Sequence, residues 1–121
     1  MIIQDAKSIN QIQNEFQEKF PGLKIEFYES EHSDHQGSHP SNQHDPAKTL
    51  REIRQQHSEG DLVIDPEMSI AELENNFEEL FGLHVQVFRR SKTLWLQTIS
   101  TDDWTLEKQN RKGVHSNQVN Q

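Results

Sequence analysis

The stretch Ser69–Arg90 constrains the fold of this chain more than any other. Ser69, followed by Glu72, has the pattern of a capping box, in which two side chains satisfy free backbone donors at the start of a helix. Apolar side chains then recur at helical spacing as far as Phe81, and Gly82 supplies the left-handed residue that commonly ends a helix. Beyond this glycine, apolar and polar residues alternate, which is the period of a strand. The stretch therefore predicts a helix followed at once by a strand.

The same pattern occurs near the N-terminus, in Ser8–Glu29. Four apolar positions of this first helix match the later one at an offset of 61 residues, and three positions of the following strand match at an offset of 60. The matched pairs are Ile9 and Ile70, Ile12 and Leu73, Phe16 and Phe77, Phe20 and Phe81, Leu23 and Leu83, Ile25 and Val85, and Phe27 and Val87. A short apolar run precedes each helix, at Ile2–Ile3 and Val63–Ile64. We interpret the chain as two pseudo-repeated strand–helix–strand units, with a chance likeness of two amphipathic elements as the alternative.

The segments outside the two copies are more polar. Residues 31–47 are rich in histidine and almost free of apolar side chains, so we expect a flexible loop there. Thr49 and Glu52 form a further capping-box pattern, which predicts a short helix that ends at Gly60. Residues 111–121 are polar without periodicity and predict a disordered tail. Residues 1–110 are then expected to form a single domain.

These elements predict an α+β fold of two layers. The helices of the two copies are expected to pack on one face of a mixed sheet of four or five strands. The expected buried residues are Ile9, Ile12, Phe16, Phe20, Leu23, Ile25, Phe27, Leu73, Phe77, Leu80, Phe81, Val85, Val87, Leu94 and Leu96. A sheet that is covered on one side leaves its other face open to solvent.

The open face of the sheet is the one feature with a physical argument for function. A turn over Arg90–Thr93 joins the strand that ends near Phe88 to a strand that begins at Leu94. An even-numbered loop sets Phe88 across from Trp95 and points both away from the helices. The candidate interface residues are Tyr28, Phe88, Trp95 and Ile99. An aromatic patch of this kind is typical of a protein interface.

The histidine-rich loop suggests a second kind of site. Its imidazoles alternate with carboxylates, and both groups are ligands of Zn²⁺, Ni²⁺ or Cu²⁺. The weak candidate ligands are His32, His35, His39 and His44. A solvated polar linker explains the same composition, because no pair has the spacing of two ligands on one helix face. We therefore assign no metal and no other cofactor.

Asp102 and Asp103 stand next to Trp104 and could be interpreted as paired carboxylates for general acid–base catalysis. A helix cap beside a buried aromatic explains them better, because neighbouring side chains diverge and no nucleophile stands nearby in the sequence. We therefore assign no catalytic residue and expect a protein that is not an enzyme.

Composition narrows the classes of partner. The formal net charge is −8, which disfavours nucleic acid and anionic membranes. No apolar run is long enough to span a membrane, and the chain contains no Cys for disulfides or thiolate zinc sites. The N-terminus lacks a basic region followed by an apolar one, so we expect a cytoplasmic protein.

The segment GLHVQVFRRSKTLWLQTISTDDWTLEKQN, with the preceding SIAELENNFEELF, resembles a family of small uncharacterised bacterial proteins. The resemblance covers about residues 49–110, and TDDWTL is its most specific part. The chain departs from that pattern in the hairpin turn, where Ser91 and Lys92 replace the favoured glycine. The resemblance supports the expected fold and implies no activity, cofactor or site residue.

Three functions remain open from the sequence. The first is a non-catalytic protein-interaction module, expected to form a homo-oligomer through the aromatic sheet face. The second is a single-stranded nucleic-acid binder that stacks bases on the same face, with Arg89, Arg90 and Lys92 on phosphates. The third is a metal-binding or catalytic role for the histidine-rich loop or the two aspartates.

Overall fold

The computed structural model describes residues 1–30 and 37–116. In chain order its elements are β1 (Ile2–Ile3), α1 (Ile9–Lys19), β2 (Leu23–Tyr28), a 3-10 helix (Pro40–Asn42), α2 (Leu50–Ile53), β3 (Gly60–Asp61), α3 (Ile70–Phe81), β4 (His84–Ser91), β5 (Leu94–Gln97) and α4 (Leu106–His115). The α+β class expected from the sequence is confirmed.

The strands form two separate antiparallel sheets. The larger has the order β2-β4-β5, and the smaller pairs β1 with β3. The expected single mixed sheet of four or five strands is therefore wrong for the described residues. The apolar runs that precede α1 and α3 lie beside each other instead of joining the larger sheet, with Leu62 donating its backbone N–H to the carbonyl of Met1 at 2.8 Å. The internal repeat stays a hypothesis.

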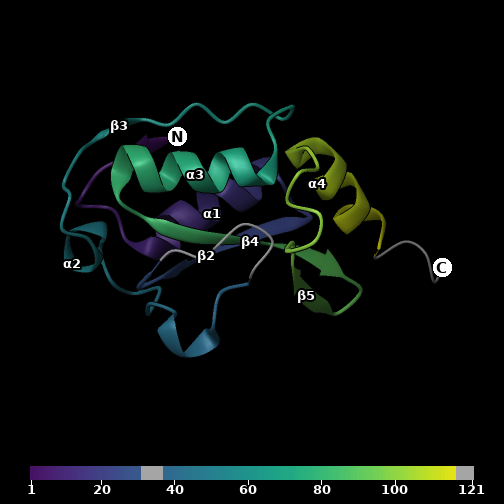
Figure 1. Cartoon of the computed structure of the whole chain (residues 1–121), viewed down its shortest axis with the longest axis horizontal. Helices are drawn as coiled ribbons and strands as arrows, with labels where there is room; N and C mark the ends of the chain where they lie inside the picture. Colours follow the sequence, from purple (N-terminus) through teal and green to yellow (C-terminus); the bar gives the residue numbers. More distant parts are fainter. Residues whose placement is uncertain (31–36, 117–121) are drawn as a thin grey trace.

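The core lies between the larger sheet and the helices α1 and α3, which Figure 1 shows along one side of that sheet. Ile25 of β2 stands opposite Val87 of β4, so their side chains share the face that the helices cover. Phe27 and Phe77 meet edge to face with their ring centroids 6.1 Å apart. Both rings are fully buried.

Three residues of the expected core are exposed. Leu80, Leu94 and Leu96 expose 53%, 63% and 42% of their surface. On α3 the side chain of Glu74 is buried in place of Leu80. The carboxylate of Glu74 accepts the backbone N–H of Val87 at 2.9 Å, which holds this side of the helix against the sheet. The two leucines of β5 lie beyond the helix layer, which packs on β2 and β4.

The helices begin in pairs. The Ser or Thr cap of each helix forms a β-bridge with the cap of another, Ser8 with Thr49 and Ser69 with Thr105. Within each pair the first helical residue donates its backbone N–H to the turn that precedes the other helix. These bonds are Ile9 to Lys48, Leu50 to Lys7, Ile70 to Trp104 and Leu106 to Met68. Backbone donors that a helix start leaves free are thus satisfied by a second helix start.

The C-terminal part of the chain is more ordered than the sequence predicts. Residues 106–115 form α4, so the tail expected from residue 111 is wrong as far as residue 116, and 117–121 lie outside the described residues. The cap of α4 is Thr105 and not one of the two aspartates that precede Trp104. The predicted helix from Thr49 to Gly60 shortens to α2, which ends at Ile53.

Two glycines let α4 approach β2 closely. A Cβ atom on Gly22 would lie 2.5 Å from the carbonyl oxygen of Asn110, and one on Gly113 would lie 3.0 Å from the Cα of Gly22. The side chain of Asn110 also accepts the backbone N–H of Gly22 at 2.7 Å. The helix is therefore fixed against the end of the sheet that carries the β4–β5 hairpin.

Part of the polar segment crosses the sheet face opposite the helices, below the sheet in Figure 1. Gln43 forms a β-bridge with Tyr28, and His44 donates its backbone N–H to the carbonyl of Phe27 at 2.8 Å. Flexibility of residues 31–47 stays a prediction, and 31–36 lie outside the described residues. No helix within the described ranges is long and apolar enough to cross a membrane.

Candidate interaction surface

The β4–β5 hairpin carries two partly exposed aromatic residues, Phe88 and Trp95. Its two-residue loop is Lys92 and Thr93, and its register sets Arg90 opposite Trp95 and Phe88 opposite Gln97. The predicted pairing of Phe88 with Trp95 is therefore wrong by two residues. A shift of two preserves the face of every side chain, so Phe88 and Trp95 still point away from α1 and α3.

Cationic side chains lie over these rings. The Nζ atom of Lys24 is 5.1 Å from the ring centroid of Phe88 and 5.2 Å from that of Trp95. The guanidinium of Arg90 lies 5.9 Å from the Trp95 ring. Phe88 and Trp95 are each half-buried. We call the surface formed by Lys24, Phe88, Arg90, Trp95 and Ile99 the aromatic sheet face.

Tyr28 does not belong to that exposed surface, although the sequence placed it there. Its side chain is buried, because the segment around Gln43 pairs with the end of β2 and covers it. Burial, with a smaller contribution from the charge of Glu26, raises the pKa of Tyr28 to about 12. Ile99 follows β5 and is half-buried.

Polar side chains mark the border of the covered area. Ser38 and Gln97 exchange two hydrogen bonds, with the Ser38 N–H donating at 3.0 Å and the Gln97 amide donating to the Ser38 carbonyl at 2.9 Å. The residues that cross the sheet from 37 to 44 thus cover its Tyr28 end. The Phe88 and Trp95 end keeps partial access to solvent.

A second tryptophan with cations lies on the opposite side of the hairpin. Lys108 places its Nζ atom 4.0 Å from the centroid of the Trp104 ring, and Lys112 and Arg89 lie at 5.7 and 5.9 Å. A hydrogen bond of 3.1 Å from Arg89 to the Gln109 side chain holds the guanidinium in place. The sequence did not predict this cluster, because α4 lay partly in the expected tail.

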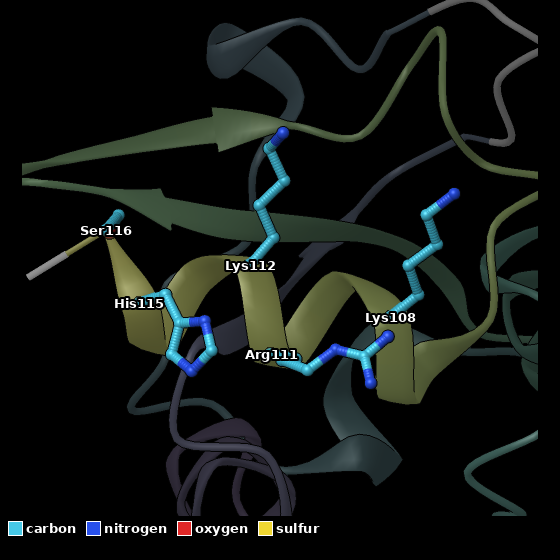
Figure 2. Close-up of a pocket in the computed structure, with 5 residues that line it drawn as sticks. All are labelled: Lys108, Arg111, Lys112, His115 and Ser116. Atoms are coloured by element: carbon cyan, nitrogen blue, oxygen red, sulfur yellow. The ribbon is translucent and has the colours of Figure 1, made fainter. Parts of the chain in front are cut away.

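A cavity of about 460 Å³ is lined by Lys108, Arg111, Lys112, His115 and Ser116. Figure 2 shows that Lys108 and Lys112 extend away from α4 on one side, whereas Arg111 runs along the helix and His115 extends toward the other side. Their charges therefore do not converge on one point as an anion pocket requires. We interpret this region as a basic surface and not as a small-molecule site.

Charge is unevenly distributed along the chain. Residues 1–79 contain 17 of the 20 Asp and Glu residues, and residues 80–101 contain none. The cations of the hairpin and α4 are Arg89, Arg90, Lys92, Lys108, Arg111 and Lys112, and Lys24 of β2 lies beside them. An acidic protein thus has a basic end that carries both of its tryptophans. The sequence contains this signal, but the total charge hides it.

The two aspartates beside Trp104 differ in their exposure to solvent. Asp102 is buried and Asp103 is exposed, so the carboxylates do not form an open pair. The backbone carbonyl of Asp102 accepts the N–H of Ala71 at 2.8 Å at the start of α3. This environment fits a structural role at a helix start, and the expectation that the two carboxylates are not catalytic stays a prediction.

The candidate metal ligands are only partly described. His32 and His35 lie outside the described residues, whereas His39 bonds to Ser41 and His44 is half-buried. Burial lowers the pKa of His44, with the positive charge of Lys48 also lowering it against the attraction of Glu29. Among residues 1–30 and 37–116, no group of three or more His, Asp or Glu side chains is arranged to hold a metal ion. Metal binding by the loop stays a prediction.

A further titratable cluster joins Asp5, Arg54 and His57. Asp5 accepts hydrogen bonds from Arg54 at 2.8 and 3.0 Å, and its other oxygen lies 2.8 Å from His57 Nδ1. Arg54 also donates to the carbonyl of Phe81 at the end of α3. Burial would raise the pKa of Asp5, but the bonds and charge of Arg54, helped by His57, outweigh it and hold the pKa below its usual value. No local pattern could reveal a contact between residues 49 positions apart.

Comparison with protein-family models, with curated proteins and with solved structures gives no match for this chain. The geometry and the charge of the surface are therefore the grounds for a functional proposal.

Proposed function

We propose that the protein is a non-catalytic protein-interaction module that self-associates through the aromatic sheet face. The observation that carries this proposal is the partial exposure of Phe88 and Trp95 on the side of the sheet away from α1 and α3. Large aromatic side chains that stay partly accessible to solvent are common anchors of protein interfaces. Burial by a second subunit would remove their remaining apolar surface from water.

Charge supports a second copy of this chain as the partner. Lys24 and Arg90 make the aromatic sheet face basic, whereas most carboxylates lie in residues 1–79. A contact between two identical basic faces would bring like charges together. A contact between the basic face of one copy and the acidic surface of another avoids this repulsion.

Sedimentation velocity over a range of protein concentrations tests the proposal. We expect Trp95→Ala and Phe88→Ser to weaken self-association while far-ultraviolet circular dichroism stays native. Leu94→Ser is the matched control, because Leu94 is an apolar residue with 63% exposure on the opposite face of the same strand as Trp95. A wild-type protein that stays monomeric at high concentration, or variants that unfold the monomer, would refute the proposal.

Single-stranded nucleic acid is a second candidate partner. The specific observation in its favour is the pairing of a partly exposed aromatic ring with cations, Lys24 and Arg90 at Trp95. Sheets bind single strands by stacking bases on such rings while cations neutralise phosphates. The net charge of −8 opposes approach of a polyanion to the rest of the molecule, so this candidate ranks second.

Fluorescence polarisation of a labelled oligo(dT) distinguishes the two candidates. Nucleic-acid binding predicts affinity that falls steeply with salt and is lost in Trp95→Ala. Absence of binding at low salt would remove this candidate and leave self-association untouched.

A further inference from the structure

The open edge of β5 is a feature that the proposed function does not use. β5 is the last strand of its sheet, and among the described residues no strand pairs with its outer edge. Thr98 donates its backbone N–H to the carbonyl of Val87 at 3.2 Å, which fixes the residues of this strand that bond to β4. By alternation, Leu94 and Leu96 bond to β4, whereas Trp95 and Gln97 direct their backbone groups outward.

Side chains on this edge are unusually apolar for an open strand. Leu94 and Leu96 expose 63% and 42% of their surface on the helix side of the sheet. Edge strands commonly carry charges or prolines that block the approach of another strand. β5 has the sequence LWLQ and carries neither.

Cations lie on both sides of the edge. Lys24 and Arg90 lie near Trp95 on one side, and Arg89 stands opposite Leu96 on the other. No Asp or Glu occurs between residues 80 and 101. A second copy that paired β5 with β5 would bring these cations together, which is unfavourable.

We propose that the outer edge of β5 receives an extended acidic segment of a partner protein as an additional strand. Residues of that segment opposite Leu94 and Leu96 are apolar and cover the two leucines. Residues opposite Trp95 and Gln97 carry carboxylates that meet Arg90 and Lys24. Main-chain hydrogen bonds hold the segment, and the alternating side chains select it. The inference rests on the proposed interaction role of the hairpin but names a different edge and a different partner.

Fluorescence polarisation of short labelled peptides tests this inference at a protein concentration below self-association. The probe is a peptide in which Glu and Val alternate, and the comparison peptides carry Gln or Lys in place of Glu. We expect the Glu peptide to bind, salt to weaken it, the Gln peptide to bind less well and the Lys peptide not to bind.

A backbone variant isolates the edge. Gln97→Pro removes an outward N–H, and Gln97→Ala is its matched control, because both lose the side-chain bonds to Ser38. We expect Gln97→Pro to bind the Glu peptide about fivefold more weakly than Gln97→Ala, as for one lost hydrogen bond. Equal affinities would overturn strand addition.

A charge variant keeps the test valid if the proline variant fails to fold. We expect Arg90→Gln to weaken the Glu peptide and to leave the affinity for the Gln peptide unchanged. Failure of every peptide to bind would overturn the inference, as would oligo(dT) binding in place of the Glu peptide. Loss of self-association in Gln97→Pro but not in Gln97→Ala would assign the edge to a second copy. Trp95→Ala tests self-association separately, so the two proposals fail independently.

Discussion

Single residues connect distant parts of this chain through buried charge. Asp5 precedes α1, Arg54 follows α2, and the carbonyl that Arg54 also contacts belongs to Phe81 at the end of α3. The side chain of Arg54 is fully buried, so removal of its carboxylate partner leaves a charge without compensation. One ion pair therefore ties together three helix ends.

We predict that Asp5→Asn lowers the free energy of unfolding by about 3–5 kcal/mol, the usual cost of removing one partner of a buried pair. Urea denaturation at neutral pH measures it. Asp61→Asn is the control, because Asp61 pairs with the N-terminal amine while two thirds exposed, and it should destabilise the protein far less than Asp5→Asn. A small effect of Asp5→Asn would show that the buried pair contributes little.

The same pair predicts a pH dependence. Because the pKa of Asp5 in the folded state is lower than its ordinary value of about 3.9, the folded protein favours the ionised carboxylate. The stability that it contributes is complete above that ordinary value and is lost as the pH falls through the lower folded pKa. Wild-type protein should thus lose its advantage over Asp5→Asn in that acidic range, as followed by urea midpoints.

Tyr28 provides a second titration at the residue scale. It is the one tyrosine of the chain, so its ionisation can be followed by near-ultraviolet absorbance without overlap from another phenol. Burial and Glu26 raise its pKa to about 12, so the folded protein favours the neutral phenol. Its contribution to stability is present below the unfolded pKa of about 10 and is lost as the pH rises through the folded value. A titration midpoint near 10 in folded protein would show that the ring is open to solvent.

At the scale of single elements, the β4–β5 hairpin contains the clearest local conflict. Lys92 has a φ of 58°, a left-handed conformation that costs a residue with a Cβ atom about 1–2 kcal/mol. We predict that Lys92→Gly raises the free energy of unfolding by about 0.5–1 kcal/mol, after the entropy of glycine in the unfolded chain is counted. Thermal unfolding of Lys92→Gly and of a control variant, Thr93→Gly, is the measurement. Thr93→Gly should destabilise, because Thr93 does not have a positive φ.

Helix α4 gives a prediction of the opposite sign from helix propensity. Glycine inside a helix usually costs about 0.5–1 kcal/mol relative to alanine. Gly113, however, contacts the backbone of Gly22, and a Cβ atom there would require β2 and α4 to separate. We predict that Gly113→Ala lowers the free energy of unfolding by about 1–3 kcal/mol. Gly60→Ala is the control, because its Cβ atom would meet Phe81 at an ordinary 3.8 Å.

These elements also show what local pattern can predict. Capping residues and apolar periodicity located α1 and α3 to within a residue, because those signals lie within the element itself. The sheet was harder, because the pairing of β1 with β3 depends on contacts between residues about 60 positions apart. Leu94 and Leu96 were placed on the correct face but wrongly buried, since alternation gives the face of a strand and not the extent of the layer above it.

The residues of the candidate interaction surface were likewise predicted only in part. Alternation correctly placed Phe88 and Trp95 on one face, whereas Tyr28 shares the parity but is covered by the segment around Gln43. The cluster around Trp104 escaped prediction because α4 has too few apolar residues to be distinguished from a tail. Its buried residues are Leu106, Gln109 and Gly113. At Gly113 a close contact with another backbone takes the place of a buried apolar side chain. Apolar periodicity in the sequence does not indicate such a contact.

At the scale of the whole molecule, positive and negative charges are unevenly distributed. The basic hairpin and α4 form one end, and the first 79 residues carry 17 carboxylates. Two like surfaces would repel each other if the aromatic sheet faces met symmetrically, whereas unlike surfaces attract. The proposed self-association therefore joins different surfaces on the two copies and need not close into a symmetric dimer.

A mixing experiment tests whether unlike surfaces of the two copies meet. Arg90→Glu reverses the charge beside Trp95 but leaves the acidic residues 1–79 unchanged. If unlike surfaces meet, we predict that the variant does not associate with itself and is still bound by wild-type protein, because each wild-type copy retains a basic face. Sedimentation velocity of labelled variant with an excess of unlabelled wild type measures this, and added salt should weaken the mixed complex. A symmetric contact between aromatic faces predicts a different result. In the wild-type complex the paired Arg90 residues would repel each other, so the mixture of Arg90→Glu with wild type would associate more tightly than wild type alone. Added salt would remove that gain in affinity. The relative strength of the mixed and wild-type complexes at low salt thus decides between the two arrangements.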